Sequence, residues 1–547
     1  MAGLATTFGS GAMTNSIKEI GNAACILAIG TNTSEGHPVI ALEIPKSTTR
    51  GGKLIVANPR EVRITRFADV WLRQRPGTDV ALLMGMAKVI VDEGLQDKAF
   101  IEARCENFEA FVESLKPFDL DFVEKTTGVP RARIVEAARM YATTKPASIL
   151  YTMGITQHTH GTDNVMAIAN LAMLTGNIGK PSTGVNPLRG QNNVQGACDM
   201  GALPNVYTGY QNVTVPENKQ KFETAWGAKL SDKVGLTVTE MMDGAHHGTI
   251  KAMYIIGENP PLSEADATHA LDALRKLDFL VVQDIFNTET TREADVILPA
   301  ATFAEKEGTF TNTERRVQRV RKAVEAPGDA KPDWWITGEI AKRMGAKGFD
   351  FQSADEIMTE VNKLTPSYGG ITHARLDKGG GLQWPCPNAE HPGTPILHTA
   401  QFTRGKGKFM PISYRPSAEL PDAEYPLVLT TGRSLFQYHT GTMTRKVKGL
   451  NSLHGEARVE IHPKDAEKLG VADGDWVAMT SRRGTVNVKA KVNTVNPEGV
   501  VFMNFHFAEA AVNILTNPAL DPVSKIPEFK VCAVKIEKKP EPVKAGV

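Results

Sequence analysis

The sequence predicts an α/β protein that combines two subdomains with parallel sheets and a small C-terminal β-barrel. A strand–glycine–helix–strand unit occurs twice, near residues 25–60 and 253–286. After about residue 425 the chain changes to closely spaced short strands. Strands that alternate with helices are typical of parallel sheets, whereas closely spaced strands with turns between them are typical of barrels.

The first copy of the unit begins with C-I-L-A-I-G-T-N at 25–32, an apolar run that is typical of a buried parallel strand. A helical stretch is expected near 37–44, and K-L-I-V-A-N-P-R at 53–60 predicts the second strand. Further helices are predicted at 79–94, 97–115, 130–144 and 162–178, and 148–157 is predicted to be a strand that leads into a loop.

The second copy begins with M-Y-I-I-G-E-N-P at 253–260 and continues with a helix near 266–276 and a strand at 279–286. Asp284 lies 27 residues after Gly257, and Asn58 lies 28 residues after Gly30. In open α/β sheets, ligands bind at the carboxyl ends of the strands. Two such units suggest two similar ligands or two halves of one large ligand, although any two strand–helix–strand units share this outline.

The remaining segments suggest a division into four parts. Residues 307–319 are polar and basic, 366–400 are rich in glycine, proline and histidine and predict a connecting segment, and 461–470 predict one helix within the barrel region. We expect a first α/β subdomain with the substrate loop at 1–190 and a second α/β subdomain at 191–303. Residues 304–397 are expected to hold the remainder of the N-terminal-type subdomain and the connecting segment, and 398–547 the barrel domain.

Bulk composition excludes several classes of protein. Lys+Arg is 62 and Asp+Glu is 61, and this balance argues against nucleic acid or an anionic membrane as the main partner. No apolar run is long enough to span a bilayer, and the first residues lack the features of a signal peptide. The five cysteines are scattered without a C-x-x-C pair, so no zinc site or iron–sulfur cluster is predicted, and a cytoplasmic location is expected.

Polar residues and glycines gather where the predicted strands end. Amides and carboxylates match the paired donors and acceptors of planar heterocycles, and glycines let the backbone approach a diphosphate. The repeated set therefore predicts a large nucleotide cofactor. Its members are Asn32, Glu35, Asn58, Pro59, Arg60, Gly77, Asp79, Met153, Gly154, Gln157, Gln191, Gly257, Glu258, Asn259, Gln283 and Asp284.

Histidines and common catalytic motifs add little. His158 and His160 would share a face if they lay on a strand, and a pair of metal ligands is one interpretation, but a polar strand end is the favoured one. His246 and His247 are expected on a solvated turn. The sequence contains no phosphate-binding G-x-x-x-x-G-K-[ST], no G-x-S-x-G and no H-E-x-x-H motif.

Residues 175–201, T-G-N-I-G-K-P-S-T-G-V-N-P-L-R-G-Q-N-N-V-Q-G-A-C-D-M-G, resemble the molybdopterin oxidoreductase superfamily. More narrowly, they resemble the catalytic subunit of formate dehydrogenases that carry molybdenum or tungsten bis-(molybdopterin guanine dinucleotide). The resemblance runs along the whole chain and includes M-G-I-T-Q-H, Y-I-I-G-E-N-P, V-V-Q-D-I-F-N-T-E-T and E-G-T-F-T-N-T-E-R-R-V-Q-R. It implies two dinucleotide-binding-like α/β subdomains and a six-stranded barrel of the double-psi type.

The same resemblance implies roles for single residues. One guanine dinucleotide would be held by Asn32, Glu35, Asn58, Gly77 and Asp79. The other would be held by Asn259, Ser263, Gln283, Asp284 and Asp333. Gln157 and Gln191 would lie near the pterins, and the barrel would contribute Thr431, Arg433, His439, Asn513 and Lys530. Arg189 matches the family's substrate arginine, whose planar guanidinium binds a carboxylate bidentately.

The chain departs from the family pattern at its front. Family members begin with a domain that holds a 4Fe–4S cluster, followed by a selenocysteine or cysteine that ligates the metal and then by a histidine. None of these is found in the 547 residues, and the start aligns shortly after that metal ligand. Our hypothesis is a selenocysteine codon read as a stop, with Met1 an artificial start. We therefore expect little activity from this chain alone.

The reaction implied is the oxidation of formate to CO2, with two electrons passed to the cluster and then to an iron–sulfur subunit of unknown identity. Molybdenum and tungsten are not distinguished, and neither nucleic acid binding nor direct membrane insertion is expected. Another molybdopterin oxidoreductase such as a nitrate reductase is one alternative. A cofactor-free scaffold, as in respiratory complexes, is another, but such relatives tend to lose the polar strand ends that this chain keeps.

Overall fold

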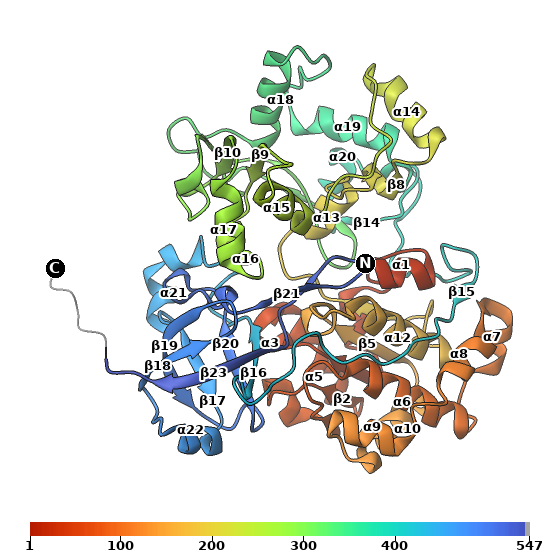
Figure 1. Ribbon diagram of the computed structural model, residues 1–547. Helices are drawn as coiled ribbons and strands as arrows, with labels where there is room; N and C mark the ends of the chain where they lie inside the picture. The colour runs from red at the N-terminus through yellow and green to blue at the C-terminus, as the bar shows by residue number, and fades with distance from the viewer. Residues whose placement is uncertain (542–547) are drawn as a thin grey trace. The chain divides into compact units, whose positions relative to one another are not determined.

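The computed structural model describes residues 1–541 and divides the chain into two compact units (Figure 1). Unit 1 contains Met1–Leu188, Leu262–Thr268 and the chain from Ile396 onward, and unit 2 contains Arg189–Pro261 and His269–Pro395. Two boundaries between the units, after Leu188 and after Pro395, lie close to the predicted borders at 190 and 397. The finer division into four parts stays a prediction.

Unit 1 is built on a five-stranded parallel sheet in the order β3-β2-β1-β5-β6. The strands are β1 Cys25–Ile29, β2 Lys53–Ala57, β3 Val70–Leu72, β5 Ala147–Tyr151 and β6 Val185–Pro187. The chain builds outward from β1 in one direction and then returns to β5 on the other side. The order of strands therefore reverses between β1 and β5, and this is where ligands bind in open parallel sheets.

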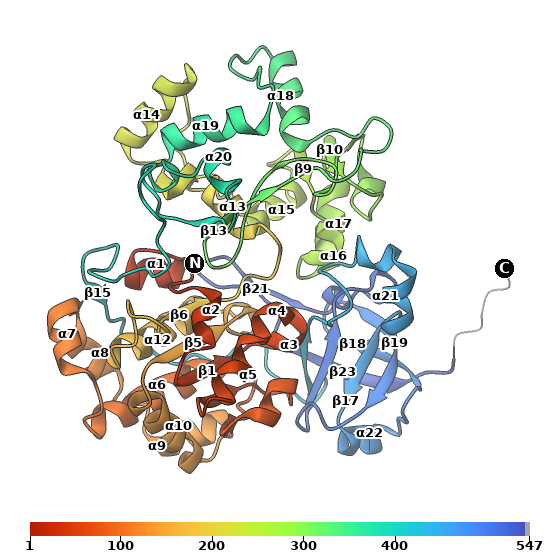
Figure 2. The ribbon, with the colours of Figure 1, turned by 180° about the vertical axis from the view of Figure 1, so that it is seen from behind.

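Both faces of this sheet are covered, as the continuous apolar runs predict. Cys25, Leu27 and Ile29 pack in one core with α6 (Asp79–Asp92), α10 (Arg131–Thr143) and α12 (Gly161–Leu174). Ile26 and Ala28 face the opposite core, which includes residues of α4 (Pro38–Ala41) and α5 (Glu43–Thr48). Figure 2 shows this sheet and its helices from behind.

The C-terminal part of unit 1 is a closed barrel in the order β16-β20-β17-β19-β18-β23. The strands are β16 Leu427–Gly432, β17 Arg458–Ile461, β18 Trp476–Thr480, β19 Thr485–Val492, β20 Val500–Asn504 and β23 Cys532–Lys538. Two pairings, β16 with β20 and β17 with β19, are parallel and the others are antiparallel. Alternate apolar residues such as Leu429, Val459 and Val501 fill its core. The predicted six-stranded barrel is confirmed.

Unit 2 holds a parallel sheet of β9 Ala252–Ile256, β10 Phe279–Asp284 and β11 Val296–Pro299, in the order β11-β10-β9. Ile255, Leu280 and Val282 pack against residues of α15 (Val238–His246) and α17 (Ala267–Arg275). A second, antiparallel sheet joins β12 Gly308–Thr311, β13 Arg316–Val320 and β14 Leu382–Gln383.

The remaining elements are further helices, together with strands of two to four residues. In the N-terminal half they are α1 Ala2–Phe8, α2 Ile17–Ile20, α3 Thr33–Gly36, α7 Lys98–Arg104, β4 Cys105–Glu106, α8 Phe108–Ser114, α9 Leu120–Thr127, α11 Met153–Thr156, α13 Val194–Asp199, β7 Val206–Tyr207, β8 Gln211–Asn212, α14 Pro216–Trp226 and α16 Pro260–Ser263. In the C-terminal half they are α18 Asp333–Arg343, α19 Ala354–Leu364, α20 His373–Leu376, β15 Gly407–Lys408, α21 Lys448–Leu453, α22 Pro463–Leu469, β21 Asn517–Leu520 and β22 Pro527–Glu528. Within residues 1–541, none of the helices combines the length and apolarity needed to cross a bilayer.

The predicted repeat is confirmed in backbone detail. The amide of Gly30, after β1, donates to the carbonyl of Ala57 at 3.0 Å, and the amide of Gly257, after β9, donates to the carbonyl of Gln283 at 2.8 Å. The two glycines have φ values of 56° and 62°, in the left-handed region that disfavours side chains. In both units the chain therefore leaves the strand through the same turn.

Several predicted boundaries were wrong. The helix expected at 97–115 is broken into α7 and α8, because Asn107 has φ 65° and cannot continue a helix. The stretch near 37–44 contains α4 and the start of α5, and the helix at 162–178 ends at Leu174. The segment 366–400 is not only a connection, since it contains α20 and β14.

Candidate functional site

The two loops at the reversal point of the unit 1 sheet are in direct contact. Gly154 donates its amide to the carbonyl of Gly30 at 3.1 Å, and the Thr152 hydroxyl donates to the same oxygen at 2.8 Å. A Cβ on Gly154 would lie 2.4 Å from the oxygen of Gly30, so only glycine fits there. The loops after β1 and β5 thus form a narrow backbone ledge at the carboxyl edge of the sheet.

Polar side chains of the predicted set surround this ledge. Asn58 is buried, and its side-chain amide is hydrogen-bonded to the backbone nearby. It donates to the carbonyl of Thr31 at 3.1 Å and accepts from the amide of Arg60 at 3.0 Å. In contrast, the buried Oδ1 of Asn32 has no hydrogen-bond partner among residues 1–541. Burial raises the pKa of the Glu35 carboxyl, and the positive charge of Arg60 opposes that effect.

Arg60 connects the first sheet to the barrel inside unit 1. Its guanidinium forms a 2.8 Å ion pair with Glu460 and a 2.8 Å hydrogen bond to Asn496. The same group lies 3.3 Å from the ring centroid of Phe502. Arg60 is therefore held by the protein itself, and its direct contact with a cofactor stays a prediction.

Asp79 lies at the start of α6 in a cluster of buried titratable groups. Its Oδ1 accepts from Gln74 at 2.9 Å, its Oδ2 lies 3.9 Å from Nε2 of His158, and burial raises the pKa of its carboxyl. On its other side, His158 Nδ1 lies 3.4 Å from Oε1 of Glu528, which is fully buried. His158 thus lies between two carboxylates, while its Nε2 contacts the carbonyl oxygen of Gly154 at 3.0 Å. Gly77, two residues before Asp79, has φ 80° and closely approaches Ser417.

The prediction that His158 and His160 lie on a strand was wrong. β5 ends at Tyr151, and both histidines lie between α11 and α12, where their rings stack with centroids 5.3 Å apart. Burial and the neighbouring His158 lower the pKa of His160 to about 4. No group of three or more His, Cys, Asp or Glu side chains suited to a metal ion was found within the described 541 residues. His246 ends α15, and His247 follows it.

The barrel gathers positive charge and buried polar groups. Lys530 donates to the carbonyl of Thr431 at 2.7 Å, and burial together with the charge of Arg433 lowers the pKa of Lys530 to about 7. The Thr431 hydroxyl donates to the carbonyl of Phe529 at 3.0 Å. Burial lowers the pKa of Arg433, and burial and Arg433 lower the pKa of His439 to about 4. Two buried basic groups whose charges interact favour an anionic ligand.

Asn513 is a further buried polar residue of unit 1 with an unsatisfied atom. Its Nδ2 donates to the carbonyls of Leu262 at 2.8 Å and Ser263 at 3.2 Å, and its buried Oδ1 lacks a hydrogen-bond partner in the described part of the chain. Buried polar atoms are rarely left unsatisfied in a finished structure. The unpaired Asn32 and Asn513 oxygens, the buried basic groups of the barrel and the glycine ledge together fit a ligand with phosphates and a polar heterocycle.

Met153 of the strand-end set and Gln157, which is predicted near a pterin, lie at the loop after β5. Met153 begins α11 and is 40% exposed, and Gln157 directly follows that helix and is half-buried. Gln191, the other residue predicted near the pterins, belongs to unit 2 and is also half-buried. All three have surface available for a ligand.

Unit 2 presents a second polar edge at the ends of β9 and β10. Gln283 donates to Asp333 at 2.7 Å and accepts from the hydroxyl of Tyr254, while Lys306 pairs with the other oxygen of Asp333. Burial raises the pKa of the Asp284 carboxyl. A Cβ on Gly257 would meet nothing within 4 Å, so the space above this turn is open.

Asn259 stabilises the turn after β10. It accepts from the hydroxyl of Thr290 at 2.7 Å and donates to Glu289 at 2.8 Å. Gly257, Asn259, Gln283, Asp284 and Asp333 are therefore brought together in unit 2. Ser263, predicted with them, belongs instead to unit 1, where its carbonyl accepts from Asn513.

Arg189 begins unit 2 shortly after β6. Its amide donates to the Thr313 hydroxyl at 3.0 Å, and its Nε donates to Oε1 of Gln195 at 3.3 Å. The guanidinium is half-buried and is positioned by α13. Such a cation can bind a planar carboxylate through charge-assisted hydrogen bonds.

Sequence reasoning missed the groups that hold these residues. In unit 1 the missed group is Glu528, and in unit 2 they are Gln195, Asp199, Tyr210, Tyr368 and Trp384. No local pattern marks them, since they come from loops and helices far apart in the chain. Gln195 and Asp199, spaced four residues apart beside Arg189, gave the one available signal.

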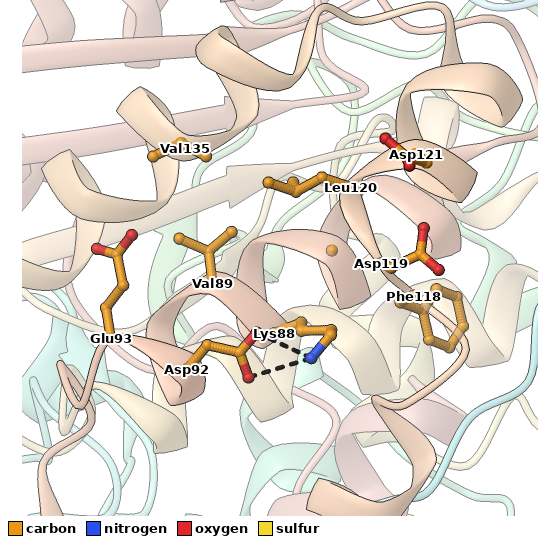
Figure 3. Close-up of a pocket in the computed structure, with 10 residues that line it drawn as sticks. Lys88, Val89, Asp92, Glu93, Phe118, Asp119, Leu120, Asp121 and Val135 are labelled. Atoms are coloured by element: carbon orange, nitrogen blue, oxygen red, sulfur yellow. Dashed lines mark hydrogen bonds and ion pairs between the residues drawn. The ribbon is translucent and has the colours of Figure 1, made fainter.

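One pocket of about 340 Å³ lies away from these residues, between α6, α9 and α10 (Figure 3). It is lined by carboxylates that already have partners: Asp92 pairs with Lys88, Glu93 with Arg139 and Asp121 with Arg131. Asp119 accepts from the amide of Phe122 at the start of α9. This pocket is therefore not included in the candidate site.

The fold and the two polar edges define the class: an α/β protein with two parallel sheets that end in glycines and polar side chains, joined to a six-stranded barrel. Residues 3–343 match the family model for molybdopterin oxidoreductase, and residues 427–533 match that for the molybdopterin dinucleotide binding domain. The chain belongs to the molybdopterin oxidoreductase family.

Two relatives illustrate the similarity in sequence. The chain is 52% identical over 541 residues to the F420-dependent formate dehydrogenase subunit alpha of Methanocaldococcus jannaschii, with 98% of this chain and 80% of that protein covered. It is 40% identical over 544 residues to formate dehydrogenase H of Escherichia coli, with 98% and 76% covered.

A solved structure shows the same fold. Acetylene hydratase from Pelobacter acetylenicus superimposes with a TM-score of 0.78, covering 98% of this chain and 80% of that one at 22% identity.

Proposed function

We propose that this chain is the catalytic alpha subunit of a formate dehydrogenase and oxidises formate to CO2. The observation that carries the proposal is the positioned guanidinium of Arg189, in a chain 52% identical to a formate dehydrogenase subunit alpha. A carboxylate of this size is bound by two parallel N–H···O bonds from one guanidinium, a geometry that lysine cannot provide.

The cofactor we propose is molybdenum or tungsten bis-(molybdopterin guanine dinucleotide). The carboxyl edge of the first sheet, through Asn32, Glu35 and Asp79, would hold one nucleotide, and Asn259, Gln283 and Asp284 would hold the other. Arg433 and Lys530 would neutralise phosphate charge. When bound, the cofactor supplies the metal centre that accepts two electrons from formate, while the residues of this chain bind, orient and neutralise.

The ligand of that metal is not among the candidate residues. All five cysteines are buried in the structure, and burial raises the pKa of Cys25, Cys105 and Cys532 to about 12. A metal-ligating side chain must be deprotonated. We propose that the metal ligand and the 4Fe–4S cluster come from sequence outside these 547 residues, since the matched relatives are longer.

We further propose that the electron partner is an iron–sulfur subunit that reduces F420. Two other relatives, at 51% and 49% identity, carry the same F420-dependent description. The cytoplasmic location and the absence of membrane insertion stay predictions.

The test uses enzyme expressed from its complete gene together with its electron-transfer subunit. We expect near two guanine nucleotides per chain after acid release, and formate-dependent reduction of F420 or of a viologen dye. Arg189→Lys should raise the KM for formate at least tenfold with the nucleotide content unchanged. A chain that contains no guanine nucleotide would support the scaffold alternative, and nitrate reduction without formate oxidation would support the oxotransferase alternative.

The polar edges favour the proposal over both alternatives. A scaffold would have no use for the buried basic groups of Arg433 and Lys530, which cost stability without an anion. The sequence context of Arg189, R-G-Q-N-N-V-Q-G, and the 52% identity to a formate dehydrogenase subunit alpha favour formate over an oxotransferase substrate.

A further inference from the structure

Asp199 is a buried carboxylate whose hydrogen-bonding capacity is filled by neutral donors. Its side chain is 0% exposed. Oδ1 accepts from Gln195 at 2.9 Å and from the Tyr210 hydroxyl at 2.7 Å, and Oδ2 accepts from the Tyr368 hydroxyl at 2.5 Å and from the Trp384 indole at 2.7 Å. An ionised carboxylate offers about four acceptor sites, so the arrangement matches the anion.

No cation among residues 1–541 forms an ion pair with Asp199, although an isolated buried anion is costly. Burial raises the pKa of the carboxyl, while the hydrogen bonds from Tyr368, Gln195, Tyr210 and Trp384 act in the opposite direction. Such a costly and fully satisfied group is expected to have a use beyond packing.

Gln195 connects Asp199 to Arg189. Its Nε2 donates both to Asp199 at 2.9 Å and to the oxygen of Tyr210 at 2.8 Å, and the amide is 1% exposed. Two acceptors on one side fix which end of the amide points inward. The carbonyl oxygen must then point the other way, where it accepts from Nε of Arg189 at 3.3 Å.

Helix α13 fixes the distance between Gln195 and Asp199. Gln195 and Asp199 are four residues apart on α13, so their side chains lie on one face. Asn193 starts the helix with φ 59° and its Oδ1 accepts from the amide of Thr311 at 2.9 Å, which fixes α13 on β12. Thr311 in turn contacts the hydroxyl of Tyr368 at 3.0 Å.

We propose that Asp199 and Gln195 are positioning residues that orient the guanidinium plane of Arg189 for its carboxylate substrate. We call this chain of contacts, from Asp199 through Gln195 to Arg189, the relay. The inference rests on the proposed function for the identity of the substrate, but not for the relay itself. Asp199 holds the amide of Gln195 in one orientation, and Gln195 holds Arg189 through its Nε edge. If the Asp199 charge were removed, the amide of Gln195 could turn and present its NH2 group to the cation.

The first test is structural and does not depend on the substrate. Crystal structures of Asp199→Asn and of a matched control, Asp521→Asn, are compared with the parent enzyme. Asp521 is also a buried carboxylate that accepts several hydrogen bonds, from Thr162 and Ser524 among others, but it lies in unit 1. We expect the Arg189–Gln195 bond to be lost in D199N and kept in D521N. A bond that persists in D199N would overturn the relay.

The second test measures formate. In cofactor-loaded enzyme expressed from the complete gene, D199N and Gln195→Met should raise the KM for formate about tenfold while kcat changes less than about twofold, because binding is weakened without loss of chemistry. Calorimetry of formate binding to dithionite-reduced enzyme, in which turnover is blocked, should show the same loss. A merely structural role would lower kcat through loss of loaded enzyme and leave the KM unchanged.

A double-mutant cycle separates a relay from a direct effect. Lysine has no planar fork to orient, so Asp199→Asn should add little to the KM of Arg189→Lys. Additive effects would contradict the proposal that Asp199 acts through Arg189. If the parent enzyme bound no formate, the proposed function would be wrong. The crystal structures of D199N and D521N would still show whether Asp199 positions Arg189 through Gln195.

Discussion

The amide of Gly154 donates to the carbonyl of Gly30 at 3.1 Å, so the first residues beyond two neighbouring strands meet backbone to backbone. This contact lies where the strand order of the unit 1 sheet reverses, and it brings the loops with Asn32 and Gln157 to one edge. The equivalent turn in unit 2, at Gly257, has the same left-handed backbone but open space above it.

Gly154→Ala should destabilise unit 1, because the new Cβ would lie 2.4 Å from the oxygen of Gly30 and one loop must move. We expect a loss of about 2–3 kcal/mol in the free energy of unfolding. Gly257→Ala is the matched control, since it meets only the left-handed backbone penalty of about 1 kcal/mol. Urea unfolding measures both. Equal losses would show that the contact is not as tight as the structure indicates.

Stability should depend on pH through Lys530. Its pKa is lowered to about 7 in the folded chain, against 10.5 for an ordinary lysine. Between these values the unfolded state binds more protons, so this group makes the free energy of unfolding rise with pH, by at most about 1.4 kcal/mol per unit. Lys530→Met should remove that rise in urea unfolding of cofactor-free protein, and Lys535→Met on the same barrel should keep it.

The same residue should make cofactor binding depend on pH. A bound diphosphate favours the charged lysine, so affinity for the guanine dinucleotide should fall as the pH rises above about 7, where Lys530 loses its proton. The measurement is the amount of guanine nucleotide that stays bound to the purified enzyme at about pH 6.5 and at about pH 8.5, on either side of that pKa. Arginine at position 530 stays charged and should remove the dependence. An unchanged profile in K530R would place the titrating group elsewhere.

Arg60→Met should destabilise unit 1 by about 3–5 kcal/mol, because it leaves the half-buried Glu460 without its 2.8 Å partner. Replacing both residues, in Arg60→Met with Glu460→Met, should cost less than the single change. Lys88→Met, which breaks an exposed pair with Asp92, should cost no more than about 0.5 kcal/mol. If the double variant were less stable than Arg60→Met, the ion pair would not explain the loss.

The two predicted nucleotide sites should be separable. Asp79→Asn in unit 1 and Asp284→Asn in unit 2 each replace an acceptor by a mixed donor and acceptor, which mismatches the paired donors of guanine. Each single variant is expected to lose about half of the guanine released from the parent enzyme, and the double variant nearly all. Asp521→Asn, which belongs to neither site, should retain the full amount. Full retention in D79N or D284N would exclude that residue as a guanine ligand.

Much of the fold could be predicted because it follows from local periodicity. Runs such as Cys25–Ile29 and Phe279–Asp284 are apolar, short and end in turn residues, so they predict parallel strands, and parallel strands bring their carboxyl ends to one edge. This is why the equivalence of Gly30 and Gly257 follows from the pattern of residues alone. Helix ends were less predictable, because the break at Asn107 follows from its left-handed backbone conformation, which the pattern of apolar residues does not indicate.

The sequence by itself determined the class of the protein, the doubled strand–glycine–helix–strand unit and the barrel, and it predicted Arg189 in its glycine-rich loop as the substrate arginine. Only the tertiary structure decided what surrounds them. Tyr368 and Trp384 reach Asp199 across 169 and 185 residues, and Glu528 reaches His158 from β22. Such partners leave no local pattern, because a buried polar group is satisfied by whichever donors the packed chain brings within about 3 Å, however distant they are in sequence.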